Sequence, residues 1–238
     1  MGKGDDVAAL EAALHALEEE HQAFLYRVSH DLREPLRKIN AFSELLRQDL
    51  GDDIPDIAAE DLSYILDGGA RMQQMLDGLL LLARANRRVV TLESVPVRAC
   101  VEQALLYIEP AALSLDWEPL PTLYTDRALL LDFYQRGLDN ARRHAKPDGP
   151  LVVRLTAEER EDAWVLGIAD NGVGIPEADR ERVFRPFERL GRPTEGAGMG
   201  LAIVRKQLAL MGAHVCLEPA VPGAHLRLTL PKTGASRS

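Results

Sequence analysis

His30 is the residue whose neighbours most favour chemistry. Asp31 adjoins it, and Glu34 lies one helical turn further along the chain. Pro35 removes a backbone hydrogen bond from an otherwise regular helical pattern, at a cost of about 3 kcal/mol. A surface histidine is usually only solvated. Here the carboxylates can hold one ring nitrogen and leave the other free as a nucleophile.

A second candidate site follows the apolar run 164–168. Asp170 comes directly after this run, and Gly172 and Gly174 come next. A carboxylate at a strand end accepts a hydrogen bond from an exocyclic amine, and glycines let the backbone approach a flat base. The same residues also form ordinary Asp-Asn-Gly turns. The segment therefore indicates either a base-binding site or a plain turn.

Residues 196–201 form a glycine-rich start to a helical run. The backbone N–H groups of Gly198 and Gly200 are suited to phosphate, because a helix start presents unpaired donors. The glycine spacing differs from that of the dinucleotide-binding fingerprint. Shortly before this segment, Phe184 and Phe187 lie in a glycine-flanked loop, which indicates a lid with a hydrophobic anchor.

Two polar residues lie near the end of the helical run 126–145. Asn140 offers a neutral oxygen to a hard cation such as Mg²⁺. Arg143 offers a positive charge to phosphate. Both are also common surface residues, so the pair indicates a site only together with the other motifs.

Residues 7–88 carry a helical periodicity that is interrupted at the turn cluster 51–55. The N-terminal apolar stripe advances by four and three residues in turn, which is a heptad pattern. A two-helix hairpin covers only one side of each stripe, so we expect two copies to form a four-helix bundle. The stripes contain Leu10, Leu14, Leu17, His21, Phe24, Val28, Leu32, Leu36, Ile39, Phe42 and Leu46, then Leu62, Ile65, Leu66, Gly69, Met72, Leu76, Leu79 and Ala83.

The second half of the chain mixes strands and helices. Strand-like runs are found at 89–92, 151–155, 164–168 and 226–230, and helical runs at 97–109, 126–145 and 199–212. Their irregular order favours an α+β sandwich over a doubly wound parallel sheet. We expect two domains, with a coiled-coil lead and helical hairpin in 1–88 and the α+β domain in 89–238.

The composition excludes several classes of protein. Apolar residues make up 46% and charged residues 27%, which is typical of a globular chain. The net charge of −9 argues against binding to nucleic acid. Two distant cysteines exclude a disulfide scaffold and favour a cytoplasmic location. No apolar run approaches the roughly 20 residues of a membrane segment.

Taken in order, the motifs resemble those of the sensor histidine kinases of two-component systems. The helical half resembles their dimerisation and histidine phosphotransfer domain, and the second half their Bergerat-type catalytic ATP-binding domain. The residues around His30 are similar to those of kinases joined to phytochrome-type photosensors. The resemblance implies a homodimer that uses ATP and Mg²⁺. It also implies a response regulator receiver domain as partner and an upstream sensor domain that is absent from this chain.

The resemblance also assigns roles by position. His30 corresponds to the phosphoacceptor, and Asp31 to the acid that helps to deprotonate it. Asn140 corresponds to the Mg²⁺ ligand, and Asp170 to the residue that reads the adenine amine. The other nucleotide-binding positions are Arg143, His144, Gly172, Gly174, Phe187, Gly198, Gly200 and Leu201.

Three residues depart from the family's pattern. Arg136 replaces a common Asn, and Ala197 replaces a frequent Thr or Ser. The side chain of Arg136 could turn toward the metal or toward the triphosphate, and we expect slow autophosphorylation. Glu34 replaces a residue that commonly positions water, which predicts weak phosphatase activity.

The main hypothesis is ATP-dependent autophosphorylation of His30 and transfer of the phosphoryl group to an aspartate of a response regulator. One alternative is a phosphatase-biased transmitter with weak kinase activity. The other is a non-catalytic ATP-binding dimerisation module.

Overall fold

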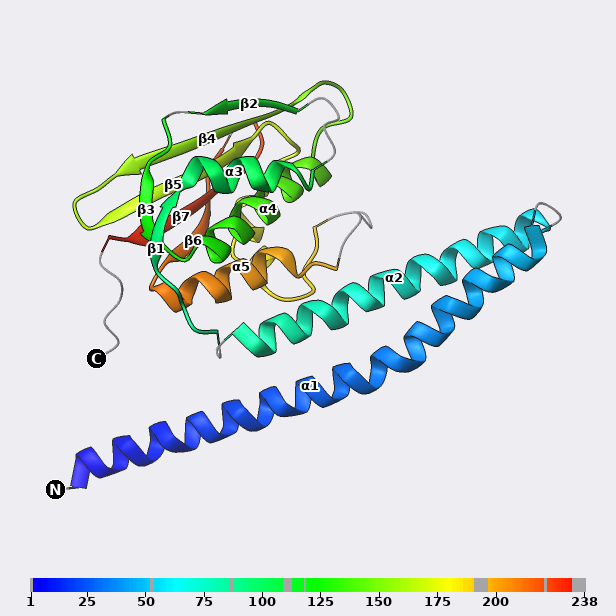
Figure 1. Ribbon diagram of the computed structural model, residues 1–238, viewed down its shortest axis with the longest axis horizontal. Helices are drawn as coiled ribbons and strands as arrows, with labels where there is room; N and C mark the ends of the chain where they lie inside the picture. Colours follow the sequence, from blue (N-terminus) through cyan, green and yellow to red (C-terminus); the bar gives the residue numbers. More distant parts are fainter. Residues whose placement is uncertain are drawn as a thin grey trace. The chain divides into compact units, whose positions relative to one another are not determined.

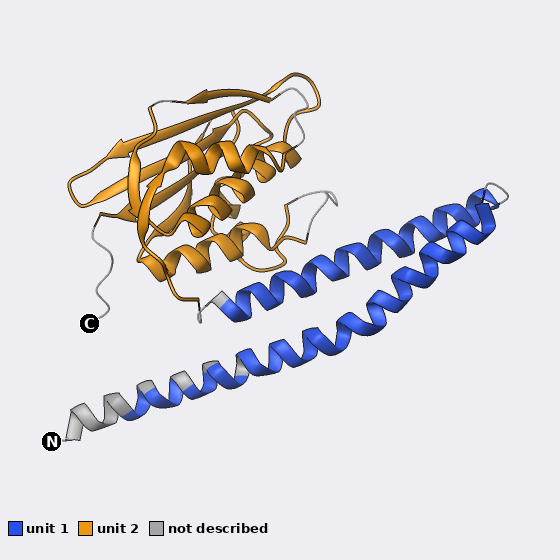
Figure 2. Cartoon of the chain, viewed as in Figure 1, with its two compact units in different colours: residues 1–85 blue, residues 86–238 orange. Residues whose placement is uncertain are grey.

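The chain forms two compact units, Met1–Ala85 and Asn86–Ser238 (Figure 2). Figure 1 labels the helices and strands of both units. The computed structural model describes residues 2–51, 54–85, 88–108, 113–117, 119–190, 197–220 and 222–232, without the side chains of residues 2–8, 11, 15, 18, 21 and 85.

The first unit is a helical hairpin of α1 (Gly2–Leu50) and α2 (Asp56–Ala85). The helix α1 continues through Pro35 without a break. The predicted hairpin is therefore confirmed. No helix among the described residues combines the length and the hydropathy that a membrane span needs.

The two helices pack through a seam that recurs every seven residues on α2. Leu62, Gly69 and Leu76 are buried along this seam. A Cβ added at Gly69 would lie 1.7 Å from the side-chain oxygen of Asn40, so the helices approach closely at this point. The predicted stripe thus includes these buried residues, whereas its members Ile65 and Met72 remain exposed.

Many of the predicted stripe residues on α1 remain exposed in the single chain. Leu10 is 72% exposed and Phe42 is 69% exposed, and on α2 Met72 is 51% exposed. The side chain of His21 lies outside the described residues. The hairpin therefore has an apolar surface that its own two helices do not cover.

The second unit contains two β-sheets in the described residues. The larger sheet has the strand order β2-β4-β5-β7-β6, with β2 and β4 parallel and the other neighbours antiparallel. The smaller sheet pairs β1 with β3. The strands are β1 Glu93–Pro96, β2 Leu113–Trp117, β3 Thr122–Thr125, β4 Leu151–Glu159, β5 Ala163–Asp170, β6 His214–Glu218 and β7 His225–Pro231.

The helices of the second unit pack on the larger sheet (Figure 1). They are α3 Val97–Leu105, α4 Arg127–Arg143 and α5 Gly200–Leu208, with 3₁₀ turns η2 Glu177–Asp179, η3 Arg182–Phe184 and η4 Ala209–Met211. Phe133 and Tyr134 of α4 are fully buried, as are Leu166 of β5 and Leu228 of β7. Alternate residues of β4 and β7 thus supply one side of the core, whereas the central strand β5 is buried at four consecutive positions. The predicted α+β sandwich is confirmed.

The strand expected at 89–92 is wrong. The strand β1 begins at Glu93, whose partner across the small sheet is Thr125. The backbone N–H of Thr91 instead donates to the carboxylate of Asp126, 3.0 Å away. A side chain has therefore taken the donor that a strand would use.

Three strands were not expected from the sequence. β2 and β6 lie at the two edges of the larger sheet, and β3 is a four-residue strand in the small sheet. These strands are only four or five residues long, so each gives a short sequence pattern. β2 pairs with β4 and β6 with β7, whereas β3 pairs with β1.

Candidate active site

His30 lies on the outer surface of the hairpin. Its side chain is 67% exposed, and its Nδ1 lies 3.2 Å from Oδ1 of Asp31. A carboxylate only accepts hydrogen bonds, so this contact requires a proton on Nδ1. The lone pair of the neutral ring then lies on Nε2, which faces solvent. The arrangement suits Nε2 to act as a nucleophile.

Glu34 does not contact His30 directly among the described hydrogen bonds. Its Oε1 accepts a hydrogen bond from Nζ of Lys38 at 2.7 Å, one turn further along α1. Both side chains are 61% exposed, so the pair adds little stability. The pairing does hold the carboxylate of Glu34 along the helix axis, on the C-terminal side of His30.

Asp170 lies at the end of β5, and its two carboxylate oxygens are in different environments. Oδ1 accepts hydrogen bonds from the backbone N–H of Gly172 at 2.8 Å and of Ala224 at 3.1 Å. Within the described residues, no donor reaches Oδ2. The first oxygen is therefore fixed by the backbone, and the second is available to an N–H donor of a ligand.

Glycines make the close packing around Asp170 possible. A Cβ at Gly172 would lie 2.4 Å from the carbonyl oxygen of His144, and one at Gly174 would lie 2.9 Å from that of Gly223. Gly174 and Gly223 also have positive φ values of 78° and 92°. A Cβ at Gly223 would lie 1.7 Å from the carbonyl oxygen of Asp170.

Sequence reasoning missed the loop that contributes Gly223 and Ala224. This loop comes directly before β7 and lies 53 residues or more after Asp170 in the chain. The Pro-Gly-Ala segment 222–224 is typical of a turn and carries no local sign of a distant partner. Its contact with Asp170 depends on the antiparallel pairing of β5 with β7, which joins Ala169 to His225.

The C-terminal end of α4 lies against the Asp170 loop. The carbonyl oxygen of His144 accepts a hydrogen bond from the N–H of Val173 at 3.0 Å. Burial lowers the pKa of His144 below its ordinary value, and the negative charge of Asp170 opposes this shift. His144 is therefore neutral at pH 7 and joins the helix to the loop.

Asn140 and Arg143 occupy the last turn of α4. Among the described residues, the side-chain amide of Asn140 forms no hydrogen bond, so its oxygen is available to a ligand. Arg143 Nε donates to Oδ2 of Asp139 at 2.7 Å, and Arg142 donates to the other oxygen at 3.1 Å. Asp139 thus partly neutralises the positive charge of Arg143 before any phosphate binds.

Arg136 forms an ion pair with a residue of its own helix. Its Nε donates to both oxygens of Asp132, at 2.9 and 2.8 Å, one turn earlier on α4. Both side chains are about three quarters buried. The intrahelical ion pair reduces the positive field that Arg136 exerts near Asn140.

Phe187 and Gly198 meet at the base of the loop that precedes α5. The N–H of Phe187 donates to the carbonyl oxygen of Gly198 at 3.0 Å. Phe187 has a φ of 67°, a conformation that costs a non-glycine residue about 1–2 kcal/mol. A Cβ at Gly198 would lie 2.8 Å from the carbonyl oxygen of Glu188, so a glycine is needed there. The hydrogen bond between Phe187 and Gly198 thus joins the two ends of the loop.

The start of α5 is open on its outer side. A Cβ at Gly200 would meet no atom within 4 Å, whereas Leu201 packs against the core. Phe184 is 1% exposed, and the guanidinium of Arg205 lies 4.8 Å from the centre of its ring. The anchor residue is therefore Phe184, and Phe187 remains 45% exposed.

The described contacts bring the predicted residues of the second unit together in two groups. One group joins Asp170, Gly172 and Gly174 to His144, and the other joins Phe187 to Gly198. His30 and Asp31 form a separate site in the first unit. No cluster of three metal-binding side chains occurs in the part of the chain that the structure describes.

Comparison with known families identifies both units. Residues 20–88 match the His Kinase A (phospho-acceptor) domain. Residues 125–234 match the histidine kinase-, DNA gyrase B- and HSP90-like ATPase family. The chain is a sensor histidine kinase transmitter. The expected resemblance is confirmed over both halves.

The transmitter is similar to cyanobacterial phytochrome A of Nostoc sp., with 28% identity over 100% of this chain and 32% of the relative. It is also similar to the sensor protein PfeS of Pseudomonas aeruginosa, with 32% identity over 95% of this chain and 52% of the relative. The chain spans about a third of the length of the phytochromes that it matches.

Solved structures share the fold of the transmitter. Full-length ShkA in complex with AMPPNP superposes with a TM-score of 0.67 at 24% identity, covering 90% of this chain and 46% of that chain. The histidine kinase AdeS of Acinetobacter baumannii gives a TM-score of 0.60 at 19% identity, covering 86% of this chain and 98% of that chain. These similarities support a fold in which a helical hairpin precedes an α+β sandwich.

Proposed function

We propose that the transmitter phosphorylates its own His30 from ATP and passes the phosphoryl group to an aspartate of a response regulator. The observation that carries this proposal is the contact of Asp31 with Nδ1 of an exposed His30. Nε2 attacks the γ-phosphorus, the bond to the bridging oxygen breaks, and ADP leaves with the electron pair. Asp31 stabilises the positive charge that develops on the ring.

The second unit supplies the nucleotide site in this proposal. Oδ2 of Asp170 accepts a hydrogen bond from the adenine amine, because Oδ1 is already held by two backbone donors. Gly172 and Gly174 leave room for the base beside that carboxylate. The backbone donors at Gly198 and Gly200 face the phosphates, with Leu201 holding the helix start to the core.

The residues of α4 fit Mg²⁺ together with a triphosphate. The amide oxygen of Asn140 is a suitable hard ligand, and Mg²⁺ usually takes few protein ligands when phosphates complete its coordination. The ion, when bound, neutralises phosphate charge. Arg143 gives up part of its contact with Asp139 and donates to a phosphate oxygen instead. Phe187 covers the nucleotide from the loop that precedes α5.

The oligomer in this proposal is a homodimer. The exposed apolar residues of the hairpin, such as Leu10 and Phe42, need a second copy to cover them. Residues 1–88 then act as the dimerisation and phosphotransfer domain, and residues 89–238 as the catalytic domain. Light scattering at micromolar concentration should give about twice 26.3 kDa, and a monomer across that range would contradict the dimer.

Incubation of the full chain with γ-labelled ATP and Mg²⁺ tests the kinase activity. We expect a label on the protein that is acid-labile and base-stable, and that is absent from His30→Gln. His214→Gln is the matched control, because His214 is an exposed histidine of β6. Absence of label from the parent, together with rapid dephosphorylation of a phosphorylated regulator, would favour the phosphatase-biased alternative.

A further inference from the structure

Asp126 is a buried carboxylate at the opposite end of α4 from Asn140. Its side chain is 5% exposed, and Oδ1 accepts hydrogen bonds from the N–H groups of Ala128 and Leu129, both at 3.0 Å. It is therefore the N-cap of α4. A cap needs only one oxygen and no second partner, but this carboxylate has two more contacts.

Both additional contacts come from the segment 88–92, which follows the hairpin in the chain. Arg88 Nη2 donates to Oδ1 of Asp126 at 3.0 Å, and the backbone N–H of Thr91 donates to Oδ2 at 3.0 Å. The side chain of Arg88 is two thirds buried. We call residues 88–92 the linker. One buried carboxylate thus holds the linker and the first turn of α4 at the same time.

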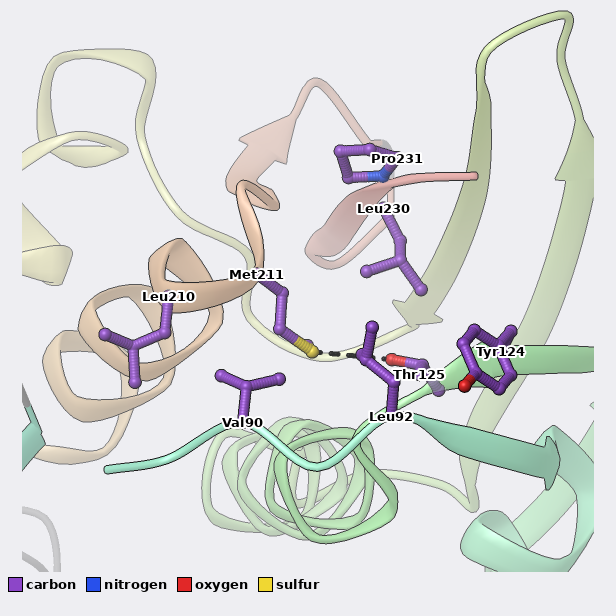
Figure 3. A pocket seen from close by; sticks show the side chains of 8 residues that line it. All are labelled: Val90, Leu92, Tyr124, Thr125, Leu210, Met211, Leu230 and Pro231. Atoms are coloured by element: carbon purple, nitrogen blue, oxygen red, sulfur yellow. Dashed lines mark hydrogen bonds between the residues drawn. The ribbon is translucent and has the colours of Figure 1, made fainter. Parts of the chain in front are cut away.

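Val90 of the linker packs against the hydrophobic core, and Val90 and Leu92 also line a cavity. Figure 3 shows Val90 and Leu92 of the linker, Leu210 and Met211 after α5, and Leu230 of β7 around this space, which measures about 230 Å³. Loose packing beneath a segment lowers the cost of moving it. The hydrogen bonds to Asp126 and the packing of Val90 against the core therefore hold the linker in place.

We propose that Asp126 is a positioning residue through which the linker and the nucleotide site are coupled. The helix α4 joins Asp126 to Asn140 across 14 positions, roughly 20 Å at 1.5 Å per residue. Its buried face packs in the core, so the helix transmits small shifts as a rigid element. Nucleotide binding then changes the free energy of docking the linker by the same amount as docking the linker changes the free energy of nucleotide binding. The inference rests on the proposed nucleotide site.

Hydrogen exchange at the amide of Thr91 measures this coupling in the full chain, with ADP and Mg²⁺ as the probe. We expect saturating ADP to raise the protection of Thr91 about tenfold in the parent. Arg88→Gln should lower the protection of Thr91 about tenfold without nucleotide, and should reduce its rise with ADP to below about twofold. Arg88→Lys, which keeps the charge, should restore much of that rise.

Arg98→Gln is the matched control, because Arg98 forms an exposed ion pair with Glu102 on α3. We expect it to behave as the parent. Unchanged exchange at Leu138, in the buried core of α4, verifies that each variant is folded. A rise with ADP that is equal in the parent and in Arg88→Gln, or no rise in the parent that binds ADP, would overturn the coupling. Failure of the parent to bind ADP would instead overturn the proposed function, and the coupling with it.

Discussion

The proposed phosphoacceptor site and the proposed nucleotide site are built in opposite ways. His30 is 67% exposed, and its contact comes from the next residue in the chain. Asp170 is held by Gly172, two residues later, and by Ala224, 54 residues later. The first site requires only one regular helix, whereas the second brings together three segments: the end of β5, the end of α4 and the loop before β7.

This difference follows from what each site has to bind. A nucleophile must reach its target, so exposure and a fixed tautomer are sufficient. A nucleotide is held through many contacts, so its site needs backbone groups at defined positions and glycines where chains approach closely. We therefore expect the hairpin to tolerate local changes that the nucleotide site does not, unless they affect the seam of the hairpin.

The largest effect should come from Leu76→Asp in the seam. Leu76 is 7% exposed between α1 and α2, and an unpaired buried carboxylate should destabilise the hairpin by about 3–5 kcal/mol. Circular dichroism should show a loss of helix, and autophosphorylation should disappear while ADP binding remains. Gln74→Asp, at an exposed position of the same helix, is the control and should remain folded. Loss of ADP binding in Leu76→Asp would show that the two regions are not independent.

Asp170→Asn should weaken ATP binding by about 10- to 100-fold, which corresponds to the loss of one buried hydrogen bond. The amide oxygen of the new Asn keeps the hydrogen bonds from Gly172 and Ala224. Its NH₂ group then faces the adenine amine, and two hydrogen-bond donors oppose each other. Isothermal titration measures the affinity. Asp116→Asn, at an exposed ion pair of β2, should bind as the parent does. Equal ATP affinities of Asp170→Asn and Asp116→Asn would show that Asp170 does not bind the adenine.

Glycine-to-alanine substitutions compare the two regions directly. In Gly172→Ala the new Cβ meets a backbone carbonyl at 2.4 Å, and we expect a loss of about 2–3 kcal/mol in stability. In Gly69→Ala it meets only the end of the Asn40 side chain, which can move, so the loss should be smaller. In Gly68→Ala it meets nothing within 4 Å, and a gain of up to about 1 kcal/mol is expected. Urea unfolding that gives any other order would contradict this reading.

Arg136→Asn should raise the rate of autophosphorylation by about threefold, because it removes a positive charge one turn from Asn140. The effect is small since Asp132 already neutralises much of that charge. Asp132→Asn frees the charge of Arg136 and should lower the rate. Initial rates of phosphohistidine formation at saturating ATP and Mg²⁺ measure both variants. Changes in the same direction would exclude this electrostatic explanation.

The smallest effect concerns acid stability. Burial lowers the pKa of His144 below its ordinary value of 6.5, so the unfolded chain takes up this proton more readily than the folded chain. Stability therefore falls as the pH decreases below about 6.5. His144→Gln should reduce the difference in the unfolding midpoint between pH 7 and pH 5. His214→Gln is the exposed control and should leave the slope as in the parent.

Parts of the fold could be predicted where a local pattern decides the structure. The heptad stripe places Leu62 and Leu76 in the seam of α2, because helical periodicity alone puts residues seven apart on one face. The same periodicity gives the exposure of His30. The apolar runs of β4, β5 and β7 indicate central strands, since burial on one face leaves a strong pattern. The roles assigned to the site residues stay predictions.

The errors occur where a distant partner decides the structure. Residues 89–92 have the composition of a strand, but the donor of Thr91 is taken by Asp126, 35 positions away. This outcome cannot be read from local propensity, because a buried carboxylate can override a weak preference for a strand.

The sequence by itself determined the two halves, the hairpin, the exposed histidine with its adjacent acid, and the glycines that pack closely around Asp170. These features depend on periodicity and on contacts within one or two turns of the chain. Only the tertiary structure decided that Gly223 and Ala224 hold Asp170, and that Asp126 joins the linker to α4. These contacts depend on strand pairing and on chain segments that meet only after folding, and their energies compete with local preferences of similar size.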